Sequence, residues 1–488
     1  MVKKMILILA LFISILIPAY AFANDAGYEG GIANEYEYKE VVFLTGSPVV
    51  FDGKLTVSTS TRSGTTTATY RYQLTSSDGG KLTRTLTFST VETPKDQYNQ
   101  IQSKTTLSRY SETITEGGNI YKLSSYEFNG SDIKSLNPGV NYFAGNFAGR
   151  KVYTLNNSKG TIIVEITDKT VGFDHAYGNV KTQQINYIIT GNTVADNTNI
   201  SWSGTADVDV SFTVNSDLEY VANDPNYISF RGGYLLSQTG QDVMKYSYDL
   251  PEFDSSGNVI GRNTGSSSAS LDEVPQEKRL VVPNVNDING TWGYDDILKL
   301  MSMEIFPNTS KYFGPKLPIT RSDFTVAVAK AINLAPYTAP KTIGYTKNKT
   351  NEISPFIDVS TTDSDYGYIK AANQAGLISG TAPNQFSPDK ALTRAEAAVI
   401  FVRALGLSNL APSGYFNTGF RDDSSIPSWA KRDIYVANEI GLLEGDGNGN
   451  INANDTLTRE EAAAMISRMI DFMMKDLSID YVQKVINY

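Results

Sequence analysis

Three arginines that each follow a threonine are the residues of this chain best suited to bind an anion. Arg321, Arg394 and Arg459 are spaced by 73 and 65 residues, and each stands where an amphipathic helix is expected to begin. A cation at a helix N-terminus opposes the helix dipole, so helix stability alone does not explain three of them. Free backbone N–H groups, the dipole and a guanidinium fork would together bind a carboxylate or a phosphate. The alternative, which the pattern leaves open, is that each arginine pairs with an acidic residue of a neighbouring repeat.

The threonines before these arginines predict how the helices start. In a capping box, a threonine side chain accepts a hydrogen bond from the third helical N–H, and a glutamate at that position reaches back to the threonine N–H. The chain has two such pairs and a weaker version with aspartate, namely Thr393 with Glu396, Thr458 with Glu461, and Thr320 with Asp323. The pattern therefore predicts three helices that begin at the arginines.

The helical region repeats itself three times, and its motifs resemble those of the S-layer homology (SLH) domain. The shared motifs are F-x-D, W-A, G-L-x-x-G and L-T-R-x-E, and they span about residues 285–485. We predict repeats at 285–345, 354–411 and 418–485, the first of them degenerate. The resemblance implies a three-lobed helical module whose grooves bind secondary cell-wall polymers, often pyruvylated. A ketal-linked pyruvate would supply the carboxylate that the arginines could bind.

The resemblance carries polymer-binding roles to the positions of this chain that match the motifs. These positions are Asp287, Trp292, Arg321, Asp358, Gly376, Gly380, Arg394, Asp422, Trp429, Gly441, Gly445 and Arg459. Repeat 2 departs from the pattern with Ser364 at the tryptophan position. Repeat 1 departs from it with Glu304 and Asn308 at the glycine positions. We therefore expect repeats 2 and 3 to carry most of the anion-binding pattern.

The region before the repeats has the patterning of β-strands. Apolar Val208 and Val210 alternate with Asp207 and Asp209, and this two-residue period indicates a strand with one buried face. Many short strands without long helical patterns predict an all-β region over 24–255, as one or two domains, built as antiparallel sandwiches or a barrel, and we favour the sandwich-like form. Residues 256–284 are rich in Ser, Gly and Asn and predict a flexible linker. The expected fold is thus multidomain, an all-β region followed by an all-α module of three repeats.

The N-terminus predicts export. Two lysines precede an apolar run that ends in a small-residue A-x-A site, which is the layout of a signal peptide over residues 1–23. After its removal no segment is long and apolar enough to span a membrane. The chain has no cysteine, a formal net charge of −10 and no Lys/Arg cluster, so neither disulfides nor nucleic-acid binding is expected. We expect a secreted protein held at the cell wall.

No catalytic site is predicted from the residues. His175 is the only histidine, so a Ser-His or metal-His site would have to rely on it alone. We expect no metal and no cofactor. The leading hypothesis is a non-enzymatic surface or S-layer protein that binds secondary cell-wall polymer and has the capacity to assemble with itself. The alternatives are an anchored polysaccharide hydrolase, whose paired carboxylates leave no local signature, and an anchored carbohydrate-binding adhesin.

Overall fold

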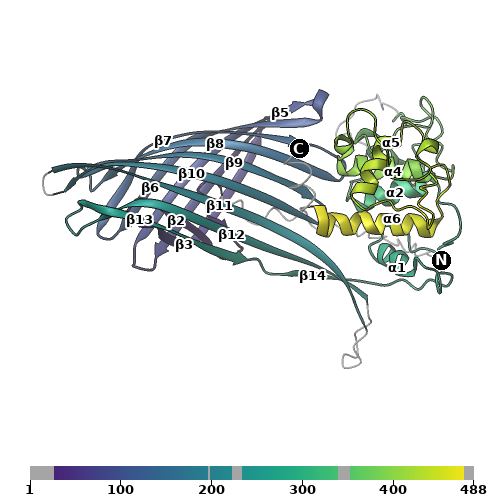
Figure 1. The fold of residues 1–488 in the computed structure, drawn as a ribbon, viewed down its shortest axis with the longest axis horizontal. Coiled ribbons are helices and arrows are strands. Elements are labelled where there is room, and N and C mark those ends of the chain that lie inside the picture. The colour runs from purple at the N-terminus through teal and green to yellow at the C-terminus, as the bar shows by residue number, and fades with distance from the viewer. Residues whose placement is uncertain (1–26, 196–197, 223–232, 339–351, 478–488) are drawn as a thin grey trace, which may run out of the picture.

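The computed structural model describes residues 27–195, 198–222, 233–338 and 352–477. The expected signal peptide lies outside these residues. The expected fold class is wrong, because about 48% of the described residues are strand and 18% are helix, and the strands form one continuous sheet and not a sandwich (Figure 1). The repeat region contains helices joined by long irregular loops, so it is not an all-α module.

Fourteen strands lie in that sheet, and all but the last pair in the order of the sequence. From β2 to β13 each strand runs antiparallel to the one before it, so the first thirteen strands form a meander. The last strand, β14, pairs antiparallel with β12 beside β13. The strands are β1 Ile32–Ala33, β2 Tyr38–Val42, β3 Val49–Arg62, β4 Thr65–Ser76, β5 Lys81–Lys95, β6 Gln100–Glu116, β7 Asn119–Ser135, β8 Val140–Leu155, β9 Gly160–His175, β10 Gly178–Ala195, β11 Thr198–Val221, β12 Gly233–Phe253, β13 Val259–Asp272 and β14 Gln276–Leu280.

The sheet curls around its own apolar core. Val208 and Val210 of β11 are buried, and the intervening Asp207 and Asp209 are exposed, as the alternation predicts. The buried face packs against the buried faces of other strands in the same sheet, because strands from β1 to β13 contribute to one apolar cluster. A single curled sheet therefore encloses the apolar core that two packed sheets were expected to form.

The first and last strands approach one another and nearly close the sheet. The Asp242 side chain of β12 accepts a hydrogen bond from Ala33 N–H of β1 at 3.1 Å. The Asn34 side chain donates to Asp272 O of β13 at 2.9 Å. Residues 256–284, expected to be a flexible linker, instead supply β13 and β14 to this seam.

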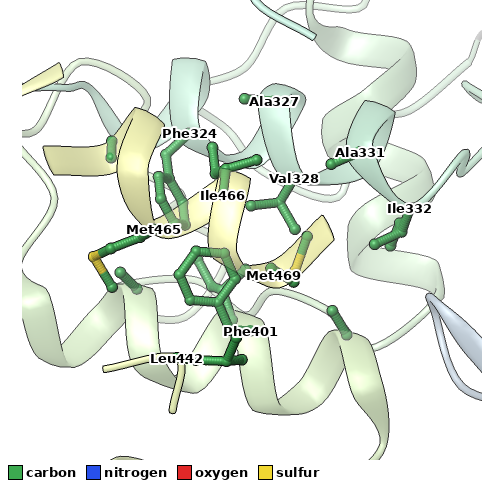
Figure 2. Packing of buried hydrophobic residues seen from close by; sticks show 14 of the residues in the cluster. Phe324, Ala327, Val328, Ala331, Ile332, Phe401, Leu442, Met465, Ile466 and Met469 are labelled. Atoms are coloured by element: carbon green, nitrogen blue, oxygen red, sulfur yellow. The ribbon is translucent and has the colours of Figure 1, made fainter. Parts of the chain in front are cut away.

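Within the described ranges, six α-helices lie at one end of the sheet, two in each repeat (Figure 1). They are α1 Tyr294–Ser302, α2 Arg321–Ala331, α3 Tyr366–Gln374, α4 Arg394–Leu405, α5 Lys431–Glu439 and α6 Arg459–Asp471. The second helices of the repeats, α2, α4 and α6, contribute Phe324, Phe401 and Ile466 to a shared apolar core (Figure 2). The predicted capping boxes of α4 and α6 are confirmed, and α2 has the threonine cap alone. Among the described residues, no helix combines the length and the apolar character that crossing a membrane requires.

The sheet and the helices form one packed unit. The Tyr177 hydroxyl of the sheet donates to Ala331 O at the end of α2, and the Tyr142 hydroxyl donates to Leu405 O at the end of α4. Helix ends leave backbone carbonyls unpaired, so these tyrosines satisfy groups that would otherwise need water. The apolar core of the repeats also includes sheet residues such as Phe173 and Leu236.

Candidate functional site

The three repeats meet around a closed ring of backbone hydrogen bonds. Ile319 N–H donates to Leu457 O at 2.9 Å, Leu457 N–H donates to Leu392 O at 2.9 Å, and Leu392 N–H donates to Ile319 O at 3.0 Å. Each of these residues comes just before the Thr-Arg pair of its repeat. The ring therefore relates the repeats by an approximate threefold arrangement and sets all three arginines around one axis.

Each arginine reaches across a junction into the next repeat. Arg321 donates to Ser379 O at 2.6 Å and to Glu396 at 3.3 Å. Arg394 donates to Ile451 O and Glu444 O, at 2.8 and 3.0 Å. The alternative prediction, of arginines paired with acids of a neighbouring repeat, therefore describes contacts present in the structure.

The third junction closes the cycle. Arg459 of repeat 3 donates to Phe313 O at 2.9 Å and to Asp323 of repeat 1 at 2.8 Å. Its guanidinium also lies over the Phe313 ring, 4.8 Å from the centroid. The acid partners Asp323, Glu396 and, at 3.9 Å from Arg394, Glu461 all occupy the third position of a helix. The same acids that cap the helices therefore also face the arginines.

The N-termini of α2, α4 and α6 have no free donors in their first three positions, so the expectation of free N–H groups at the arginines is wrong. The first N–H of each helix donates to the preceding loop of another repeat, as Arg394 N–H does to Asp455 O at 3.0 Å. The second N–H does the same, as Ala395 N–H donates to Ala453 O at 2.9 Å. The third donates to the capping threonine. An anion at these sites would thus depend on the guanidinium groups.

The three predicted aspartates each accept hydrogen bonds from backbone N–H groups in a loop of their own repeat. Asp358 accepts hydrogen bonds from Phe386 N–H and Ser387 N–H at 2.9 and 2.7 Å. Burial alone would raise the pKa of Asp358, but these two hydrogen bonds outweigh it and lower the pKa. Asp287 and Asp422 accept equivalent pairs of backbone hydrogen bonds. Both oxygens of each carboxylate are therefore engaged within the protein.

The glycines have two different backbone roles. Gly376 and Gly441 end α3 and α5 with φ of +74° and +72°, which is the left-handed region that favours glycine. In repeat 1, Glu304 adopts φ of +57° at the equivalent place, so the turn is kept at a conformational cost. Gly380 has no room for a side chain, because an added Cβ would lie 2.5 Å from Gln385 O.

The two predicted tryptophans point to solvent. Trp292 is 60% exposed and Trp429 is 57% exposed, so simple core packing does not explain them. The residue after Trp292 is Gly293, whose added Cβ would lie 3.3 Å from the Glu460 side chain. Glu460 directly follows Arg459, so the backbone at Trp292 and Gly293 of repeat 1 lies near the first turn of α6 in repeat 3.

The predicted arginines therefore reach into the next repeat, whereas the predicted aspartates bind loops of their own repeat. We name the three inter-repeat junctions grooves A, B and C, each defined by one repeat's arginine and by the tryptophan and glycine positions of the next repeat. Groove A combines Arg321 with repeat 2, groove B combines Arg394 with repeat 3, and groove C combines Arg459 with repeat 1. Groove A lacks the tryptophan and groove C lacks the glycines. Groove B has the full set, Arg394, Trp429, Gly441 and Gly445.

The arginines also differ in accessibility. The Arg321 side chain is only 7% exposed, whereas those of Arg394 and Arg459 are 19% and 18% exposed. Burial lowers the pKa of Arg321, and the charge of Glu396 partly offsets this. Arg321 is thus positioned as part of the module interior, while Arg394 and Arg459 face their grooves.

A second group of charged residues, absent from the predictions, lies inside the sheet. Arg84 pairs with Glu40 and Glu112 at 2.7 Å each, and Lys151 pairs with Glu29. Burial alone would raise the pKa of Glu112, but the charges of Arg84 and Lys151 outweigh it and lower the pKa to about 2. The remaining cavity is about 40 Å³, which is room enough for water but too small for a sugar ring. In the sequence, a charged residue on the inner face of a strand looks the same as one on the outer face. Only the structure therefore shows that these charges point inward.

His175 lies in the hairpin between β9 and β10, and its Nδ1 accepts a hydrogen bond from Tyr177 N–H at 3.1 Å. Burial lowers its pKa to about 4, so the ring is neutral near pH 7. The unprotonated Nδ1 accepts a backbone hydrogen bond within the turn, so His175 has a structural role there.

Comparison with known proteins identifies the repeats. The S-layer homology domain model matches residues 286–325, 355–398 and 419–463. These segments fall within the predicted repeats.

Similar proteins include both enzymes and surface-layer proteins. The chain is 32% identical over 148 residues to an endoglucanase of Bacillus sp. (strain KSM-635), a match to 30% of this chain and 15% of that protein. It is 30% identical over 220 residues to exoglucanase XynX of Acetivibrio thermocellus, covering 45% and 19% of the two chains. It is 32% identical over 133 residues to the surface-layer 125 kDa protein of Lysinibacillus sphaericus, covering 27% and 11%.

These matches cover only a small part of each relative. Each covers less than a fifth of the relative's length, and the enzyme matches fall on SLH segments, so they do not bear on catalysis by this chain. A surface layer protein of Brevibacillus choshinensis is also similar, at 32% identity over 104 residues, which is 21% of this chain and 9% of that protein. The chain is a cell-surface protein with three S-layer homology domains in its C-terminal part.

Proposed function

We propose that the SLH domains hold this protein on the cell wall by binding a secondary cell-wall polymer in grooves B and C. The observation that supports this is that Arg394 and Arg459 are partly exposed and each reaches across a repeat junction, into a repeat whose predicted tryptophan is exposed to solvent. The tryptophan offers an apolar face for a sugar ring, and the guanidinium offers charge-assisted donors for an acidic substituent. A ketal-linked pyruvate on the polymer would supply that carboxylate.

Groove B is the principal site in this proposal. Arg394 already donates to Glu444 O, the carbonyl next to Gly445, so a sugar at Gly445 would lie beside the guanidinium. Groove C keeps Arg459 and Trp292 and is the secondary site. Groove A contributes to the packing of the module through the buried Arg321.

The curled sheet is the part displayed away from the wall, as a component of a surface coat or layer. Its polar outer face and buried apolar face suit a self-contained extracellular unit. The carboxylates that gather inside the described sheet face Arg84 and Lys151 around a cavity of about 40 Å³, so they do not offer the open cleft that glycoside hydrolysis needs. We therefore favour display over catalysis.

The test is sedimentation of the full-length protein with purified cell walls. The full chain is needed because the sheet and the repeats share one apolar core. Walls stripped of secondary polymer should not retain the protein, and retention by stripped walls would refute anchoring through that polymer. Mild-acid removal of pyruvate ketals from intact walls should also release it. If depyruvylated walls bind as well as untreated ones, the carboxylate assignment is wrong although anchoring stands.

A variant pair then tests the guanidinium. Arg394→Lys keeps the charge but loses the planar fork, so we expect weaker wall binding and a small change in melting temperature. Arg321→Lys changes the same residue type in groove A and serves as the matched control. Equal loss of binding in both variants at equal stability would refute the ranking of the grooves.

A further inference from the structure

The pairing of β6 with β7 is interrupted in the middle of the sheet. Gln100–Thr106 and Thr113–Glu116 of β6 pair with β7, and residues 107–112 do not. Beside this gap, the β5–β6 register shifts between Thr87 and Phe88, so Ser108 is an extra residue in β6. Bulges that re-aim side chains are frequent next to functional sites.

The gap brings Tyr110 to the surface. Tyr110 lies opposite Leu86, which is fully buried. Residues that lie opposite one another in a sheet point to the same face, so in a regular sheet the Tyr110 side chain would point inward. It is nevertheless 41% exposed, and its hydroxyl lies 3.5 Å from Ser124 O of β7, across the gap. One face of an aromatic ring is therefore available at a place where a regular sheet would have hidden it.

A groove of about 690 Å³ crosses the outer face of β4, β5 and β6 at this place. Its floor is made of hydroxyl side chains, Thr67, Thr69, Thr85, Thr87, Ser89, Ser108 and Ser111. Hydroxyls both donate and accept hydrogen bonds, so this floor matches a ligand that is itself rich in hydroxyls. The shortage of apolar side chains in the groove argues against a lipid or a protein partner.

Two exposed arginines stand on opposite sides of that floor. Arg71 of β4 lies opposite Thr85, and Arg109 of β6 lies opposite Thr87. Standard strand spacing and rise put their α-carbons roughly 12 Å apart. Within the described part of the chain, neither arginine forms an ion pair within 4 Å, although the protein as a whole is acidic. Two unneutralised guanidinium groups favour a ligand with acidic groups at intervals.

We propose that this groove binds an acidic glycan, with Arg71 and Arg109 on its carboxylates, the Ser/Thr floor on its hydroxyls and Tyr110 against a sugar face. This site is separate from the SLH grooves and does not depend on how the protein is anchored.

The test is calorimetric titration of the full-length protein with oligogalacturonate at low salt. Tight binding is expected, and the double variant Arg71→Gln/Arg109→Gln should lose about tenfold or more in affinity, since hydrogen bonds to charged groups are among the stronger ones. Tyr110→Ala should weaken binding several-fold. Arg62→Gln, an exposed arginine of β3 outside the groove, and Arg394→Gln, in the SLH region, should leave affinity unchanged.

Three outcomes would overturn the proposal. The first is no binding of oligogalacturonate. The second is equal affinity for poly-L-glutamate, which would make the groove a general polyanion surface. The third is an equal loss in Arg62→Gln or Arg394→Gln, which would place the ligand elsewhere. Circular dichroism of each variant checks that the fold is kept.

Discussion

Substitution of Trp429 by alanine tests the central groove with little disturbance to the fold. The side chain is 57% exposed, so of a total of about 250 Å² it leaves about 140 Å² in contact with solvent. A sugar ring that covers half of this surface removes about 70 Å² from water, which corresponds to about 1.8 kcal/mol at about 25 cal/mol per Å². We therefore expect about a 20-fold loss in affinity for the wall polymer.

The assay is the concentration dependence of sedimentation with purified walls, together with a thermal melt of each variant. Tyr415→Ala is the matched control, because Tyr415 is 95% exposed and lies outside the matched SLH segments. Trp429→Ala should lose affinity with an unchanged melting temperature, and Tyr415→Ala should change neither. Unchanged binding by Trp429→Ala, or an equal loss in the control, would refute the role of groove B.

Three further predictions concern the described fold. Arg84→Leu leaves buried glutamates without their main partner, so urea unfolding should show a loss of about 3–5 kcal/mol; a loss below about 1 kcal/mol would contradict this reading. Burial raises the pKa of Asp242 to about 7, so the folded state binds the extra proton and stability should fall as pH rises from about 4 to 7. Asp242→Asn should remove that part of the pH dependence, by up to about 4 kcal/mol, and an unchanged slope would contradict the assignment. Thr458→Ala removes the cap of α6 and should cost about 1 kcal/mol in thermal or urea unfolding, with Thr456→Ala as a nearby control that should cost less.

Strand positions followed from the sequence, but the architecture did not. The alternation around Val208 shows which face is buried, yet it does not show what the face packs against. A sandwich and a curled single sheet both satisfy the same two-residue period. The strands are also long, up to 24 residues in β11, and such length lets one sheet wrap around its own core.

The supposed linker shows a second limit of patterning. Residues of β13 are nearly all exposed, and Leu271 is its one buried apolar residue. A strand at a seam is held by backbone hydrogen bonds to β12, which leave no trace in side-chain composition. Its Ser- and Gly-rich sequence therefore resembled an unstructured segment.

The sequence by itself determined the local features of the SLH repeats. It located the repeats, the helix starts at Arg321, Arg394 and Arg459, and the two capping boxes, because caps and periodic helices depend on residues only a few positions apart. The tertiary structure alone decided which residues meet. Arg394 faces the loop of the following repeat, and the helix N–H groups are taken by neighbouring carbonyls, because the closed ring of three repeats joins positions more than 50 residues apart.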